Sequence, residues 1–169
     1  EIAFPELTIQ QRISLGRKSM FLMTGNLADL FAIPYIDQKW LDKHTIVHGA
    51  EHVVQALAAG KGLLMLGMHV GNGDLAANLI ALRKWPIHLI TKFFKNQRLN
   101  KIWFALRGYH GVNYIEPHGE KTPFQILKAL KANGMVVFVL DQFMGKPYGI
   151  ETTFFGRKTG TAQGLALFY

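Results

Sequence analysis

The chain has 169 residues, 49% of them hydrophobic, and its 19 Lys and Arg against 11 Asp and Glu give a formal net charge of +8. This composition supplies the core of a compact domain and excludes a disordered chain, while no window reaches the ~20 consecutive apolar residues that a membrane-spanning helix needs. The absence of cysteine excludes disulfides and thiol catalysis and suits a cytoplasmic protein, and the positive charge favours an acidic partner such as nucleic acid, an anionic membrane surface, a phosphorylated lipid or an acidic protein.

The first predicted elements are helical. Apolar residues recur near helical spacing over residues 8–31, which predicts one helix, or two helices separated at Gly25-Asn26. A short strand is expected at residues 45–48, and a helix over residues 51–59 follows it.

Beyond residue 60 the predicted elements alternate regularly between strands and helices. Strands are expected at residues 63–68, 87–91, 112–116 and 135–140, and helices at residues 74–83, 97–107 and 122–132. Alternation of this kind predicts an α/β fold with a mostly parallel or mixed central sheet flanked by helices, preceded here by the N-terminal helical segment. Residues 163–169 begin what resembles a further helix. We therefore expect residues 1–169 to form a single domain that is part of a longer protein.

Positive charge is concentrated in the middle of the chain. No Asp or Glu occurs between Leu75 and Ile115, where seven basic residues fall: Arg83, Lys84, Lys92, Lys95, Arg98, Lys101 and Arg107. Such a run is either a solvated helix face or a binding surface. Zinc-finger spacing, an RRM-like signature and a basic heptad helix are all missing from the sequence, so we expect no nucleic-acid partner.

Ligands of α/β sheets bind at the carboxyl ends of the strands, which directs attention to the residues that follow each strand. Those residues are His69, Lys92, Glu116 and Asp141. His69 shares its loop with Asp74, and on a continuous helix their five-residue offset would turn the two side chains about 140° apart. The pair can converge only through a loop, which the glycines of this stretch permit.

A histidine held by a carboxylate is fixed in tautomer and becomes a better base, although a His at a strand end and an Asp capping a helix are each common structural features. The sequence limits what such a base would activate. The only serines, Ser14 and Ser19, lie in the N-terminal helical stretch, and no Gly-x-Ser-x-Gly motif is present. The simplest scheme has His69 take a proton from a hydroxyl of the substrate itself.

Two other interpretations of this loop remain open. Gly71-Asn-Gly-Asp-Leu-Ala76 fits the Gly-x-Gly-x-x-Ala pattern of dinucleotide sites, but the acidic residue expected about 20 positions later is missing, which leaves only an NADP-type site using Lys92. A metal site built from His69, Asp74 and Asp141 lacks a compact ligand pattern, so we expect no metal.

Several blocks together resemble a known family. His69-x4-Asp74 matches the His-x4-Asp/Glu motif of glycerolipid acyltransferases, and its surroundings resemble the bacterial lipid A biosynthesis acyltransferases. The blocks occur in family order: His69-Val-Gly-Asn-Gly-Asp74, Lys95-Asn96 with Arg107 and Gly111 downstream, Asp141-Gln142, and Phe154-Phe-Gly-Arg157 with Thr161. They cover about residues 60–164. This chain has Gly73-Asp74 where the family usually has Trp-Glu.

The resemblance implies direct acyl transfer from an acyl carrier protein thioester, or acyl-CoA, to a hydroxyl of a lipid A precursor or related glycolipid, without a cofactor. His69 would be the general base and Asp74 its partner. Arg107 and Asp141 match positions that the family needs for activity, with Arg107 a candidate for binding phosphate or stabilising the oxyanion. The candidate substrate-binding residues are Gly71, Asn72, Asn96, Gln142 and Arg157.

The resemblance also implies a location at the cytoplasmic face of the bacterial inner membrane, with the protein bound to the membrane surface or anchored by a segment outside this chain. Family members have an N-terminal membrane helix and a longer C-terminal part, and we expect both to lie outside residues 1–169. The alternatives are acylation of a lysophospholipid or another glycolipid, an NADP-binding module, and a non-catalytic lipid-binding domain.

Overall fold

The computed structural model describes residues 2–117 and 119–169, which form an α/β fold. Its helices are α1 (Ile9–Ala32), η1 (Ile33–Tyr35), α2 (Gln38–His44), α3 (Ala50–Ala58), α4 (Gly73–Leu82), α5 (Gln97–Arg107), α6 (Thr122–Lys131) and η2 (Gly164–Leu167). Its strands are β1 (Leu63–Gly67), β2 (Ile87–Ile90), β3 (Asn113–Ile115), β4 (Met135–Val139), β5 (Gly149–Phe154) and β6 (Arg157–Ala162). The fold class predicted from the sequence is confirmed.

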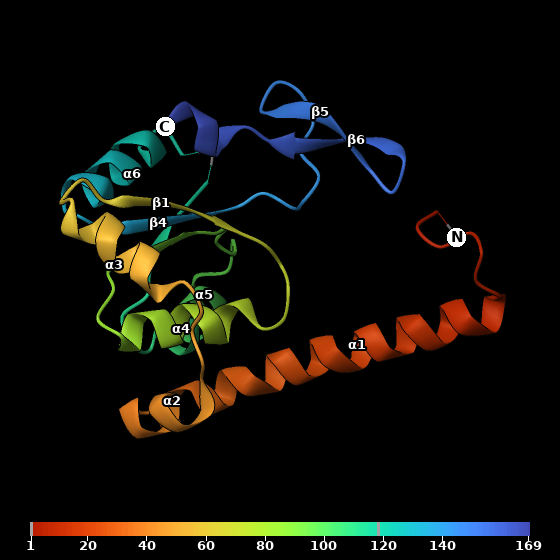
Figure 1. The fold of residues 1–169 in the computed structure, drawn as a ribbon, viewed down its shortest axis with the longest axis horizontal. Coiled ribbons are helices and arrows are strands. Elements are labelled where there is room, and N and C mark those ends of the chain that lie inside the picture. The colour runs from red at the N-terminus through yellow and green to blue at the C-terminus, as the bar shows by residue number, and fades with distance from the viewer. Residues whose placement is uncertain (1, 118) are drawn as a thin grey trace.

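Four parallel strands form the central sheet in the order β1-β4-β2-β3. β4 lies between β1 and β2 and is a continuous apolar run, as expected of a strand covered on both faces. Its side chains alternate between two core clusters: Met135 and Val137 pack with Ala77 of α4, whereas Val136 and Phe138 pack with residues of α6. Helices α4 and α6 therefore cover opposite faces of the sheet (Figure 1).

Helix α1 is one continuous helix and does not break at Gly25-Asn26. Its first turn is closed by a capping box, in which the Thr8 side chain accepts from the Gln11 amide and the Gln11 side chain accepts from the Thr8 amide. The C-terminal part of α1 lies against the body of the fold, while its N-terminal part extends away from it (Figure 1). In the part of the chain that the structure describes, no helix combines the length and apolarity needed to cross a membrane.

Residues 45–48 do not form the predicted strand. Thr45 instead ends α2, where its hydroxyl donates to the Leu41 carbonyl at 2.7 Å, and the segment that follows lies beside α4, where it borders a cavity, rather than along the sheet edge. The antiparallel β5–β6 hairpin was not predicted either. Its two-residue turn, Phe155-Gly156, has positive φ at both positions (49° and 68°), the geometry that matches the twist of paired strands.

Candidate active site

The carboxyl ends of β1 and β4 bring His69 and Asp141 into contact. The strands are parallel neighbours with Gly67 opposite Val139, so the residues two positions after each strand are placed side by side. His69 Nδ1 lies 2.7 Å from Asp141 Oδ1, and the His69 backbone N–H donates to Asp141 Oδ2 at 2.7 Å. One carboxylate therefore fixes both the backbone and the ring of His69.

This contact also fixes the tautomer of His69. Burial acts to raise the pKa of Asp141, but the hydrogen bonds from the His69 side chain and backbone outweigh it and hold the pKa below its ordinary value of 3.8. An ionised carboxylate only accepts hydrogen bonds, so Nδ1 must carry the proton that faces it. In the neutral ring, Nε2 is then left with a lone pair, and the His69 side chain is 57% exposed. The arrangement is that of an oriented and accessible base.

Asp74 pairs with Arg107 rather than with His69. Arg107 Nε and Nη2 both lie 2.7 Å from Asp74 Oδ1, which ties the first turn of α4 to the last turn of α5. The guanidinium also lies 5.4–5.6 Å from the ring centres of Trp103, Phe104 and Tyr114. Within residues 2–117 and 119–169, no hydrogen bond or ion pair joins His69 to Asp74. The geometry thus differs from the expected His69–Asp74 pair, because α4 directs Asp74 toward α5.

The Arg107–Asp74 pair is largely enclosed. The Arg107 side chain is 12% exposed and that of Asp74 is 24% exposed. The hydroxyl of Tyr114, whose ring packs beside the guanidinium, is buried and has no hydrogen-bond partner among the residues that the structure describes; burial raises the pKa of this phenol well above its ordinary value. The guanidinium is therefore held rigidly by one carboxylate and three aromatic rings.

Helix α1 clamps the loop that carries His69. Asn26 Nδ2 donates to the Gly71 carbonyl at 3.0 Å, and Gly71 has a φ of 68°, which a glycine adopts at little cost. Asn72 uses both ends of its amide: Oδ1 accepts from the Leu75 N–H and caps α4, while Nδ2 donates to Asp29 Oδ2 at 2.9 Å. The structure thus gives Gly71 and Asn72 contacts within the protein that hold the loop in place.

Asn78 is a further polar residue of this region that sequence analysis missed. It is fully buried on α4, where its Nδ2 donates to the carbonyls of Asp74 (2.9 Å) and Arg107 (2.6 Å) and its Oδ1 accepts from the His110 N–H (3.2 Å). The only available signal was an amide within an apolar helix. Asn78 joins the same two helix ends as the Asp74–Arg107 pair, so it supports their geometry.

An apolar cavity of about 650 Å³ opens beside His69. Asp74 and Arg107 also line it, and the rest of its wall is mainly aliphatic, contributed by α1, α4 and the central sheet; examples are Met23, Leu27 and Val137. The volume lies within the range of about 300–1,000 Å³ that is typical of ligand pockets. A mainly apolar wall with a few polar groups at one end suits an apolar chain that carries a polar reacting group.

The other predicted site residues lie outside this cavity. Asn96 caps α5 by accepting from the Arg98 and Leu99 amides at 3.0 and 3.2 Å. Gln142 follows Asp141 and is exposed, and Arg157 is an exposed residue at the turn of the β5–β6 hairpin. Among the described residues, no group of three or more His, Asp or Glu side chains is placed to hold a metal ion.

The basic residues of the middle of the chain fall into two groups, one with hydrogen-bond or ion-pair partners and one that is exposed. Arg107 is held by Asp74, and Arg83 donates to the Thr45 hydroxyl at 3.1 Å. The side chains between β2 and the start of α5 are exposed instead: Lys92, Lys95 and Arg98. This exposed basic segment begins after the carboxyl end of β2. It therefore lies at the same edge of the sheet as His69 and Asp141.

Comparison with known proteins identifies the family of this chain. A family model described as bacterial lipid A biosynthesis acyltransferase matches residues 1–169. The chain is 27% identical over 141 residues to a phosphatidylinositol mannoside acyltransferase of Mycobacterium tuberculosis, covering 82% of this chain and 45% of that protein. It is 24% identical over 166 residues to a lipid A biosynthesis acyltransferase of Haemophilus influenzae, covering 98% of this chain and 51% of that protein.

A third relative is a phosphatidylinositol mannoside acyltransferase of Mycolicibacterium smegmatis, 25% identical over 140 residues, which cover 82% of this chain and 46% of that protein. The chain spans about half the length of the curated relatives it matches. The match of the family model extends from the first residue to the last and so includes both His69 and Asp141. The chain therefore belongs to the bacterial lipid A biosynthesis acyltransferase family.

Proposed function

We propose that His69 and Asp141 form the base of an acyl transfer from a carrier thioester to the hydroxyl of a glycolipid. The observation that carries the proposal is the pair of 2.7 Å contacts between the two residues, with His69 in the wall of a cavity of about 650 Å³. Asp141 holds the proton on Nδ1, which leaves Nε2 to accept the proton of an incoming hydroxyl. The cavity holds the acyl chain of the donor.

The reaction needs no covalent enzyme intermediate. His69 Nε2 removes the proton of the lipid hydroxyl as the hydroxyl oxygen attacks the thioester carbonyl carbon. The carbon–sulfur bond then breaks, and the imidazolium returns the proton to the departing thiolate. The products are an ester and a free thiol, and the base is restored.

Asp74 and Arg107 act in this scheme mainly by positioning. Their ion pair fixes the start of α4 relative to the end of α5, and both side chains line the cavity near His69. Arg107 uses Nε and Nη2 on Asp74, while the same cationic group faces the cavity. A positive group held in an enclosed site also favours the negative charge that develops on the thioester oxygen.

The choice of donor and acceptor rests on charge and on the family. The exposed basic segment suits an acidic acyl carrier protein, whose thioester would enter at the same edge of the sheet. The relatives are described as acting on lipid A or on phosphatidylinositol mannoside, and both names denote lipids that carry sugars. We therefore propose a glycolipid hydroxyl as the acceptor, in preference to that of a lysophospholipid.

The exposed apolar side chains of α1 support a site of action at the cytoplasmic face of the inner membrane. Phe21 is 79% exposed and Leu22 is 65% exposed, and the basic residues Arg17 and Lys18 precede them on the same helix. Helices that combine exposed apolar and basic side chains bind at the surface of anionic bilayers. The acceptor lipid would then reach His69 without leaving the membrane surface.

The test uses the full-length protein with acyl carrier protein thioesters, acyl-CoA and a panel of glycolipid and lysophospholipid acceptors. Replacing His69 with Ala is expected to lower kcat by a factor of about 10²–10⁴, the usual contribution of a general base. His52, an exposed histidine of α3, serves as the control, and His52→Ala should leave the rate unchanged. Acyl transfer at the wild-type rate by the His69→Ala protein would overturn the proposal.

A further inference from the structure

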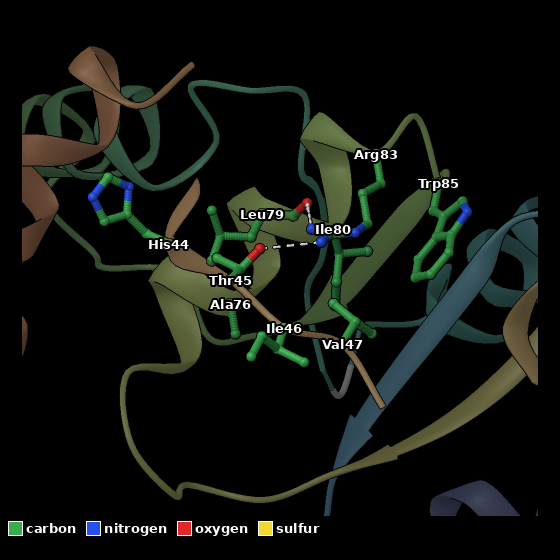
Figure 2. Close-up of a pocket in the computed structure, with 9 residues that line it drawn as sticks. All are labelled: His44, Thr45, Ile46, Val47, Ala76, Leu79, Ile80, Arg83 and Trp85. Carbon is green, nitrogen blue, oxygen red and sulfur yellow. Dashed lines mark hydrogen bonds between the residues drawn. The ribbon is translucent and has the colours of Figure 1, made fainter. Parts of the chain in front are cut away.

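A second cavity lies beside the first and also borders α4. It measures about 400 Å³, is open to solvent, and is bordered by α4, by the segment that ends α2 and follows it, and by Trp85 (Figure 2). Most of its wall is apolar, including Ile46, Val47 and Leu79. The one cationic side chain there, Arg83, is already engaged, because it donates to the Thr45 hydroxyl at 3.1 Å and to the Leu79 carbonyl at 3.5 Å.

The two cavities share two residues, Ala76 and Ile80. These lie one helical turn apart on α4 and so on the same face of the helix. Figure 2 shows both side chains on the side of α4 that faces Ile46 and Val47. Ile80 also packs against the core cluster that lines the cavity beside His69. A single layer of side chains therefore separates the two cavities.

We propose that Ile80 is the residue that limits the length of the acyl chain, with Ala76 completing the same wall. This inference rests on the proposed function, because it takes the cavity beside His69 as the acyl site. A chain that enters at His69 and runs along α4 meets Ile80 about two helical turns from the start of this helix. Beyond Ile80 the wall remains apolar, so shortening this side chain extends the site into space that accepts further methylenes.

The test measures donor preference in the full-length protein. Rates are compared over a series of acyl carrier protein thioesters whose chains differ by two carbons. Burial of one methylene contributes about a factor of four, so Ile80→Ala should raise kcat/KM for the donor two carbons longer than the wild-type optimum by about 15-fold relative to that optimum. Ile80→Phe should shift the preference toward shorter chains.

Leu79→Ala is the matched control. Leu79 occupies the same helix and lines only the second cavity, so its truncation widens that cavity and leaves the wall in place. The preferred chain length of Leu79→Ala should equal that of the wild type. A shift of the same size in Leu79→Ala and Ile80→Ala would overturn the assignment of Ile80.

Ile80→Val serves if Ile80→Ala does not fold, since it removes one methyl group and should give a smaller shift in the same direction. Binding of free fatty acids of graded length by the same variants supplies a readout independent of turnover. If no thioester is turned over but the preferred fatty acid lengthens in Ile80→Ala or Ile80→Val, the proposed reaction is wrong and the assignment of Ile80 stands. An unchanged length profile in folded variants of Ile80, or no fatty-acid binding by the wild type, overturns the assignment.

Discussion

At the scale of single residues, the site depends on one carboxylate that contacts its histidine twice. Asp141 accepts from both the backbone N–H and the ring of His69, so it fixes the position and the tautomer of this histidine together. Asp74, the residue nearer in sequence, performs a different task by holding Arg107. One acidic residue thus orients His69, and the other joins two helices.

Asp141→Asn is expected to lower kcat by a factor of about 10²–10⁴, an effect comparable to removal of the base itself. The amide can donate to Nδ1, which favours the tautomer with the proton on Nε2 and leaves that atom unable to accept the proton of the hydroxyl. Steady-state kinetics of the full-length protein test this. A rate within twofold of wild type would show that the His69 tautomer does not depend on Asp141.

The same contact predicts a dependence of stability on pH. Because the pKa of Asp141 in the folded protein is held below its ordinary value, the contact stabilises the folded state above about pH 4 and its contribution is lost as pH falls through the lowered pKa. Urea unfolding at a series of acidic pH values should show the wild type and Asp141→Asn converging in free energy of unfolding. A difference in free energy of unfolding that stays constant over these pH values would contradict the predicted pH dependence.

At the scale of elements, the loop between β1 and α4 is held from two sides. Asp141 at the end of β4 holds His69, and residues of α1 hold Gly71 and Asn72. The loop is therefore fixed by one strand and one helix that lie far away in sequence. Gly71 supplies the positive φ of the turn, and Asn72 ends the loop and caps α4.

Asn72→Ala is expected to lower the free energy of unfolding by about 1 kcal/mol, the usual cost of losing a helix cap. The variant also loses the contact with Asp29, so the loop should loosen and kcat should fall as well. Asn72→Ser separates the two effects, since serine caps the helix but is too short to replace the amide that reaches Asp29. The free energy of unfolding of Asn72→Ser, measured with urea, should be near the wild-type value while its kcat stays low. Wild-type kcat in both variants would contradict the role of α1 in holding the loop.

The central elements could be predicted because their signals are local. The apolar run of β4 and the helical spacing of α4 and α5 depend only on neighbouring residues, and the structure confirms these elements. The prediction of a strand at residues 45–48 was wrong because a short apolar stretch does not reveal whether a strand is available to pair with it. The turn at Phe155-Gly156 was missed because it places a bulky aromatic residue at positive φ, where glycine or asparagine is usual.

The sequence could indicate which candidate residues follow the strand ends, but not how these residues pair. Strand ends identified His69 and Asp141, because parallel strands end at a common edge whatever their order. The sequence could not show that β4 lies next to β1, so the acidic residue five positions from His69 looked like its partner. The actual hydrogen bond spans 72 positions, and the contacts from Asn26 and Asp29 span more than 40. Contacts of this range are set by the strand order and by the docking of α1.

At the scale of the whole molecule, the charge is distributed unevenly. The exposed basic segment lies after β2, whereas the basic residues of α6 lie on the helix that covers the opposite face of the sheet from α4. The direction of the field therefore depends on where the charges lie as well as on the net charge of +8.

Reversing Lys92, Lys95 and Arg98 to Glu together is expected to raise KM for an acyl carrier protein thioester by about tenfold at low salt, because repulsion replaces attraction toward an acidic donor. The effect should shrink as salt screens the charges. Reversing Lys121, Lys128 and Lys131 changes as many charges near and on α6 and serves as the control. Equal changes in KM for both triple variants would show that only net charge matters.

The continuity of α1 has a mechanical consequence. Asn26, which donates to the loop beside His69, and Ile9, in the first turn of the helix, are about 25 Å apart along the axis of α1. A tilt of about 10° around the loop contact would displace the N-terminal end of α1 by about 4 Å, so holding that end in place restrains the loop to a small angular range. A surface that binds the first turns of α1 would therefore also restrict the motion of the loop that carries His69.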